Sequence, residues 1–94
     1  MSASGTATLA FGSTPVTETS VVVSMAGIGP GSLVEFWIMG TPSTGTNTTS
    51  DHDFGGTSLR LTCTAIVAGT SATCHASCLA GAATGDFTIC WVWV

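Results

Sequence analysis

Four cysteines are the residues of this chain best suited to chemistry. They are Cys63, Cys74, Cys78 and Cys90, and four cysteines allow three disulfide connectivities. A bridge from Cys74 to Cys78 would close a small loop, whereas Cys63 and Cys90 each lie in the middle of a strand-like segment. We therefore predict the pairs Cys63–Cys90 and Cys74–Cys78. The alternative is that Cys63 and Cys90 are free thiols that serve as small core residues.

Two short clusters carry side chains that can ligate metals. Residues 74–78 read Cys-His-Ala-Ser-Cys, but a structural zinc site usually draws on two close ligand pairs, and this segment offers one. Asp51, His52 and Asp53 are weak candidates for a hard cation such as calcium, because their loop lacks further oxygen donors at regular spacing. We expect neither a metal nor another cofactor, and we interpret residues 51–53 as a solvated loop tip.

Catalysis would require a nucleophile with a positioned base. Serines are plentiful and His52 and His75 are available, but no serine stands in a Gly-x-Ser-x-Gly elbow. The sequence also assigns no orienting partner to either histidine. We therefore predict no catalytic residues and a protein that is not an enzyme.

The shortage of charge narrows the remaining functions. Charged residues make up 6% of the chain, against about a quarter in an ordinary soluble domain. Binding to nucleic acid depends on Lys and Arg, and Arg60 is the single residue of either type. The first twenty residues lack the basic start and apolar core of a signal peptide, and the apolar run 89–94 is too short to cross a bilayer. We expect no nucleic-acid partner, no membrane contact and no secretion signal.

Alternation of apolar and polar residues predicts strands. We expect one β domain over residues 1–94, a small antiparallel β-sandwich or jelly-roll-like barrel, because short strands alternate with Gly- and Pro-rich turns. In segment 59–67 the alternation turns Cys63, Ala65 and Val67 toward the core. The long polar stretch 40–56 is predicted to be a loop. The predicted strands are 6–11, 17–25, 33–39, 59–67, 71–76 and 86–94.

The tryptophans are predicted to pack against protein, although an exposed tryptophan on a sheet can also stack on a sugar ring. The last strand is apolar on both faces, which is typical of a strand at the centre of a sheet or under a neighbouring subunit. A domain of this size also gains stability from oligomerisation. The residues that we assign to the core or to a subunit contact are Trp37, Met39, Trp91, Val92, Trp93 and Val94.

The order of these segments resembles a family of small structural proteins of tailed bacteriophages and prophages. The resemblance runs from about Phe11 to Val94. It rests on FGSTPVTETSVVVSMAGIGPGSLVEFWIM, on SDHDF at 50–54, on LRLTCTAIVAGTSATCHA and on the final Trp-Val-Trp strand. The Asp/His segment is shorter here than in that family, and the last three cysteines are additions to its pattern.

The resemblance implies a virion structural protein, with capsid decoration or cementing as its role. Its partners would be the major capsid protein or other virion proteins and further copies of itself, as a homotrimer or another homo-oligomer. It would be located in the virion, assembled in the host cytoplasm and released by lysis. Disulfides would then form after lysis, since the cytosol keeps thiols reduced. The alternative is a tail-fibre or tail-tip module that recognises a host surface glycan.

Overall fold

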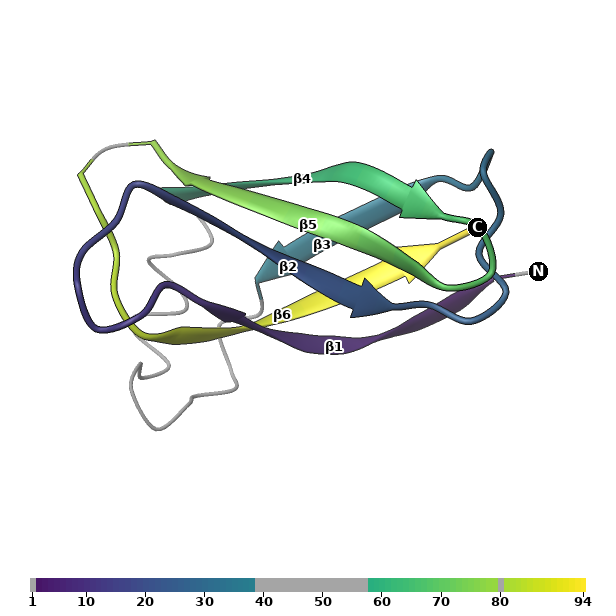
Figure 1. Ribbon diagram of the computed structural model, residues 1–94, viewed down its shortest axis with the longest axis horizontal. Coiled ribbons are helices and arrows are strands. Elements are labelled where there is room, and N and C mark those ends of the chain that lie inside the picture. The colour runs from purple at the N-terminus through teal and green to yellow at the C-terminus, as the bar shows by residue number, and fades with distance from the viewer. Residues whose placement is uncertain (1, 39–57, 80) are drawn as a thin grey trace.

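Six β-strands make up the regular structure of residues 2–38, 58–79 and 81–94, the part of the chain that the computed structural model describes (Figure 1). Each predicted strand is present, so the all-β class is confirmed. The bounds differ by a few residues; the first strand, for example, begins at Ala3 and not at Thr6. The strands are β1 (Ala3–Ala10), β2 (Glu18–Ser24), β3 (Val34–Ile38), β4 (Leu59–Val67), β5 (Ser71–Cys78) and β6 (Asp86–Trp93).

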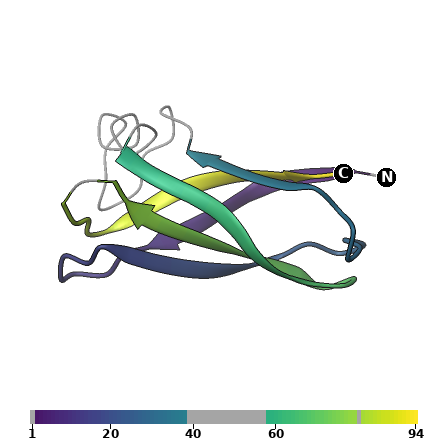
Figure 2. The ribbon, with the colours of Figure 1, turned by 90° about the horizontal axis from the view of Figure 1, so that it is seen from above.

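The strands form two three-stranded antiparallel sheets that pack as a β-sandwich, seen as two layers in Figure 2. The β6 sheet has the order β1-β6-β3, and the β5 sheet has the order β2-β5-β4. At one edge of the sandwich β1 lies near β2, and at the other edge β3 lies near β4. The terminal strand is therefore the centre of its sheet, which is one of the two positions that its apolar sequence predicts.

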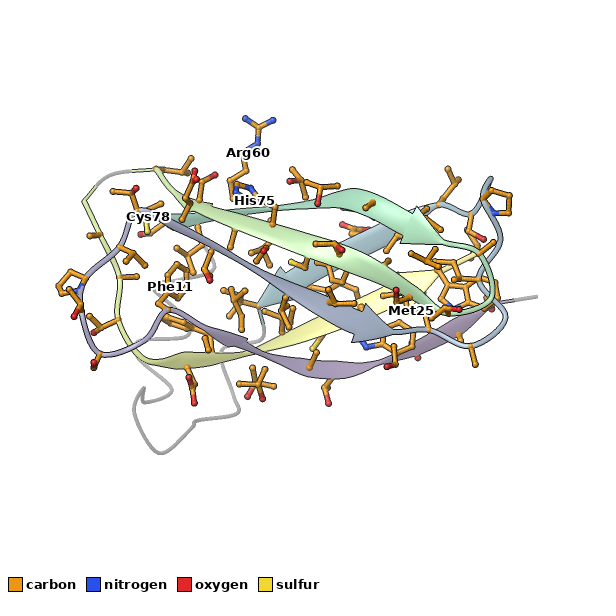
Figure 3. All side chains as sticks on the ribbon, in the orientation of Figure 1. Phe11, Met25, Arg60, His75 and Cys78 are labelled. Carbon is orange, nitrogen blue, oxygen red and sulfur yellow. The ribbon has the colours of Figure 1, made fainter. Side chains whose placement is uncertain are left out.

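The core joins large side chains of the central strand β6 to small side chains of the central strand β5. Phe11 and Phe87 meet edge to face, with ring centroids 5.7 Å apart and an interplanar angle of 85°. Phe11 and Met25 lie toward opposite ends of the core, while Arg60 points away from the sandwich (Figure 3). The buried apolar residues of the two central strands that belong to this core are Phe87, Ile89 and Trp93 on β6 and Ala72, Cys74 and Ala76 on β5.

The predicted orientation of Ala65 and Val67 toward the core is wrong, because β4 contains a β-bulge. The register pairs Cys63 with Cys74 and Ala65 with Thr73, so Thr64 is an extra residue between them. An extra residue reverses the alternation beyond it, because side chains of a strand point to opposite faces with a period of two. Ala65 and Val67 are consequently exposed, and Ile66 packs against the core instead.

Gly5 leaves space for a tryptophan of the neighbouring strand. Residue 5 of β1 stands opposite Trp91 of β6, and a Cβ atom at residue 5 would lie 2.7 Å from Cζ2 of Trp91. That separation is well inside the ordinary contact distance between carbon atoms, about 3.5–4.0 Å. The glycine and the tryptophan are therefore complementary, and Trp91 packs against the core.

Candidate interaction surface

The outer face of the β6 sheet carries apolar side chains where β3 lies beside the end of β6, while β1 presents the exposed Ser4, Thr6 and Thr8 there. Glu35 stands opposite Val92, and Trp37 stands opposite Cys90. Leu33 and Val94 extend the series beyond the strand ends, because each donates its backbone N–H to the other's carbonyl oxygen, at 3.0 Å in both directions. We call Leu33, Glu35, Trp37, Val92 and Val94 the β3–β6 patch.

The apolar side chains of the β3–β6 patch are accessible to a partner. Leu33 is 73% exposed, Val94 59% and Trp37 40%. A shallow hollow of about 350 Å³ lies at one end of the patch, lined by Leu33, Val34, Glu35, Val92 and Val94. A cluster of exposed large apolar residues around a hollow, with a carboxylate beside it, is typical of a protein contact surface.

The structure divides the residues that were predicted to be core or interface. Trp93 is 4% exposed and belongs to the core, and Trp91 packs against it. Val92 is partly buried, whereas Trp37 and Val94 are exposed. Met39 lies outside the described residues. Leu33, the most exposed member of the patch, begins the predicted strand 33–39 directly after a Gly/Pro-rich loop, and for that reason it was not assigned to the core or to a contact.

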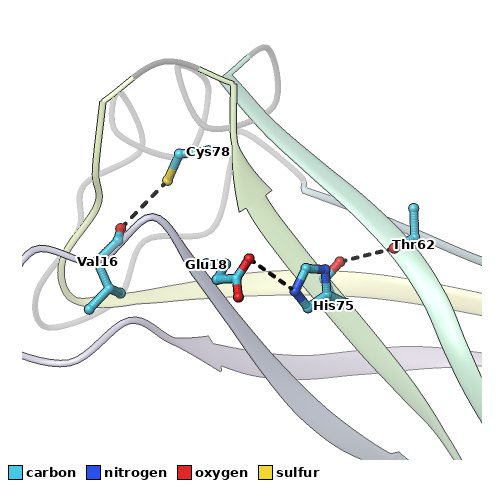
Figure 4. A network of polar contacts seen from close by, with 5 residues as sticks. All are labelled: Val16, Glu18, Thr62, His75 and Cys78. Atoms are coloured by element: carbon cyan, nitrogen blue, oxygen red, sulfur yellow. Dashed lines mark hydrogen bonds and ion pairs between the residues drawn. The ribbon is translucent and has the colours of Figure 1, made fainter.

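The outer face of the β5 sheet carries polar side chains around His75, although Val22 is also exposed on this face. His75 stands between Ser20 of β2 and Thr62 of β4 in the register. Its Nε2 lies 3.8 Å from Oε2 of Glu18, and the Thr62 hydroxyl donates to the backbone oxygen of His75 at 3.5 Å (Figure 4). These groups form a flat, hydrated surface, and such an ion pair is worth little when water surrounds it.

The predicted disulfide pairs are incompatible with the strands that carry them. All four cysteines are free. Cys74 and Cys78 lie four residues apart on β5, which places their Cα atoms about 13 Å apart in an extended strand, beyond the limit of about 7 Å for a bridge. Cys63 faces the core from the β5 sheet, but Cys90 lies on the outer side of β6, between Thr6 and Trp37 in the register.

The four thiols have different surroundings. Burial raises the pKa of the Cys74 thiol to about 12, and the nearby Cys63 adds to this increase. Burial also raises the pKa of the Cys90 thiol. Cys78 Sγ lies 3.8 Å from the Val16 carbonyl oxygen (Figure 4), and Cys63 Sγ lies 3.8 Å from the Ala65 carbonyl oxygen.

The Cys-His-Ala-Ser-Cys segment at 74–78 does not form a metal site in the described structure. Cys74 and His75 are consecutive on β5, so one side chain points into the core and the other points outward. Among the described residues, no three His, Cys, Asp or Glu side chains gather as a metal site would require. Asp51, His52 and Asp53 lie outside those residues.

The described segments contain no helix with the length and apolar character needed to span a membrane. A comparison with protein-family models, with curated proteins and with solved structures finds no match to the chain.

Proposed function

We propose that the chain is a tailed-phage virion structural protein that decorates the capsid and stabilises it through apolar contacts between subunits. The observation that carries the proposal is the β3–β6 patch, with Leu33, Trp37 and Val94 exposed on one face of the sandwich. The order of sequence motifs and the near absence of charge support the same role. The partners of the chain would be the major capsid protein or other virion proteins, and further copies of the chain itself.

The mechanism is burial of the β3–β6 patch in an assembled shell. A specific contact removes about 800 Å² from each partner, so the contact would extend from the patch over the rest of the β6 sheet. Apolar area removed from water contributes about 25 cal/mol per Å² before the costs of association. The polar face of the β5 sheet would then remain in contact with water.

A lysine exchange tests this proposal with a matched control. Leu33→Lys places a charge in the β3–β6 patch, whereas Val22→Lys places one on the outer face of the β5 sheet, where the valine is 67% exposed. We expect wild type and Val22→Lys to self-associate in sedimentation experiments and to occupy particles to the same extent. Leu33→Lys should sediment as a monomer and lose occupancy by at least about ten-fold, as a loss of about 1.4 kcal/mol would produce.

Two outcomes would overturn the proposal. If Leu33→Lys and Val22→Lys occupy particles equally, the β3–β6 patch does not form the contact. A labelled chain found in a few copies at the tail, and not in many copies over the head, would reject capsid decoration. Truncation after residue 90 is unsuitable as a test, because Trp91 and Trp93 pack in the core and their loss would unfold the chain.

A second candidate function follows from Trp37. Its side chain is 40% exposed on a sheet face next to Glu35 in the alternation, and an exposed ring beside a carboxylate can stack on and bond to a sugar. This is the tail-module alternative, recognition of a host surface glycan. Binding of the chain to glycan arrays, lost in Trp37→Ser and retained in Leu33→Lys, would favour it over decoration.

A further inference from the structure

Cys63 and Cys74 stand directly opposite each other on β4 and β5. Opposed residues of an antiparallel pair have Cα atoms about 4.5–5.5 Å apart, within the range of about 4.4–6.8 Å that a disulfide spans. Both side chains face the interior of the sandwich. The backbone therefore already meets the main geometric requirement for a cross-strand bridge.

The two thiols differ in access. Cys74 is 0% exposed. Cys63 is partly exposed and lines an open hollow of about 350 Å³ together with Pro30, Thr64, Ala65 and Ile66. The bulge at Thr64 lies next to it, at the edge of the sheet. An oxidant in solvent can therefore reach Cys63, whereas Cys74 is closed to solvent.

We propose that Cys63 and Cys74 form an oxidative modification site, in which a low-molecular-weight disulfide such as oxidised glutathione converts the pair to an intrachain disulfide. The Cys63 thiolate attacks the small disulfide, forms a mixed disulfide and releases one glutathione thiolate, which takes up a proton. Cys74 then attacks Sγ of Cys63. The mixed bond breaks, and the second glutathione leaves with the proton that Cys74 gives up. Two thiols are oxidised and one glutathione disulfide is reduced to two thiols.

The order of these steps follows from the environment of each thiol. Thiol–disulfide exchange requires a thiolate and an accessible sulfur. The raised pKa of Cys74 makes it a poor first nucleophile. Once Cys63 carries glutathione, however, the sulfur that Cys74 must attack belongs to the residue directly opposite it on β4. The inference is independent of the proposed function, because it concerns only the β4–β5 pair.

Peptide mapping of the full chain tests the proposal. The reduced protein is incubated with oxidised glutathione, its remaining thiols are alkylated, and the peptides are analysed by mass spectrometry without reduction. We expect a peptide pair joined through Cys63 and Cys74, with the mass of two hydrogens lost. Cys78→Ser and Cys90→Ala serve as matched controls and should give the same joined pair.

Two variants resolve the steps. Cys74→Ala should accumulate glutathione on Cys63, since nothing displaces it, and Cys63→Ser should lose both the joined pair and glutathione on Cys74. Circular dichroism checks that each variant folds. If a variant does not fold, the peptide map of the wild-type protein still tests the proposal. An unreacted Cys63 in folded wild type, or a bridge that joins Cys63 to Cys78 or Cys90, would overturn the proposal.

Discussion

The central strands of the two sheets contribute core side chains of opposite size. The central strand of the β6 sheet sends Phe87, Ile89 and Trp93 into the core, whereas the central strand of the β5 sheet sends in Ala72, Cys74 and Ala76. Large side chains on one layer can interdigitate with small ones on the other only if both sets are fixed in register. The contrast is confined to the central strands, because Val23 of β2 and Leu61 and Ile66 of β4 add large side chains on the β5 side.

The outer faces of the two sheets differ as well. The β6 sheet presents the β3–β6 patch, while the β5 sheet presents charged, imidazole and hydroxyl side chains together with the exposed Val22. A strand with apolar residues on both faces is stable when protein covers both faces, whereas a strand that alternates can leave its polar face in water. Under the proposed function, this difference assigns the contact to the β6 sheet.

The largest expected effect comes from removing a large core residue of β6. Trp93→Ala should reduce the free energy of unfolding by about 3–5 kcal/mol, whereas Cys74→Ala on β5 should reduce it by about 1 kcal/mol. Urea unfolding under reducing conditions measures both changes. Similar losses in the two variants would contradict the contrast in size between the two central strands.

A conservative variant separates ring packing from hydrogen bonding at the same position. Nε1 of Trp93 is buried with no hydrogen-bond partner in the described structure, and a buried donor without an acceptor is costly. Trp93→Phe keeps an aromatic ring and removes that donor. It should therefore retain most of the stability that Trp93→Ala loses.

Alkaline pH should weaken the β5 side of the core. Burial and then the nearby Cys63 raise the pKa of Cys74 from 9.0 to about 12, so between these values the unfolded chain binds fewer protons than the folded chain. The stabilisation is fully present below pH 9 and is lost as pH rises toward 12, at about 1.4 kcal/mol per pH unit. Unfolding free energies measured across this window in wild type and in Cys74→Ala test it.

The pH dependence of stability can be compared between a thiol of each sheet, Cys74 on β5 and Cys90 on β6. Cys90 on the outer side of β6 also has a pKa raised by burial, so its loss of stability runs in the same direction. Cys74→Ala should flatten the pH dependence more than Cys90→Ala does, because Cys74 is in the core between the layers. If Cys90→Ala flattens the pH dependence as much or more, ionisation of the outer thiol destabilises the fold more than ionisation of the core thiol, which contradicts the prediction.

A smaller effect is expected from adding one methyl group to β1. Gly5→Ala would bring Cβ against the Trp91 ring, and forcing an extra methyl group into a packed core costs about 1–3 kcal/mol. Gly31→Ala is the matched control, because a Cβ there meets no atom within 4 Å. The control should stay within about 0.5 kcal/mol of wild type, and an equal change in both variants would mean that Trp91 moves aside freely.

Sequence alternation was sufficient for the strands and for most of the core. It placed Phe87, Ile89, Trp91 and Trp93 on one face because β6 has no irregularity, and in the structure that face meets the core. It was wrong at Ala65 and Val67 because a bulge reverses alternation without a distinctive residue to mark it. One inserted residue in β4 thus exposes a valine that the pattern would bury.

The same bulge also decides which residue of β4 stands opposite Cys74. If β4 and β5 paired without it, the register that joins Ala65 to Thr73 would place Thr64, not Cys63, opposite Cys74. The close sequence spacing of Cys74 and Cys78 suggested a loop, but both lie on one extended strand. The β3–β6 patch was only partly predictable, because the choice between core and contact for a two-sided apolar strand depends on which face meets the second sheet.

The smallest expected effect lies on the polar face of the β5 sheet. Glu18→Gln removes one partner of the 3.8 Å contact with His75, and an exposed ion pair of this kind contributes less than about 1 kcal/mol. The two side chains are partly or largely exposed, so the loss should fade with added salt. Unfolding at low and high ionic strength measures it, and sedimentation of the same variant should match wild type. Dissociation of Glu18→Gln would show that the polar face takes part in assembly and would end the functional distinction between the two sheets.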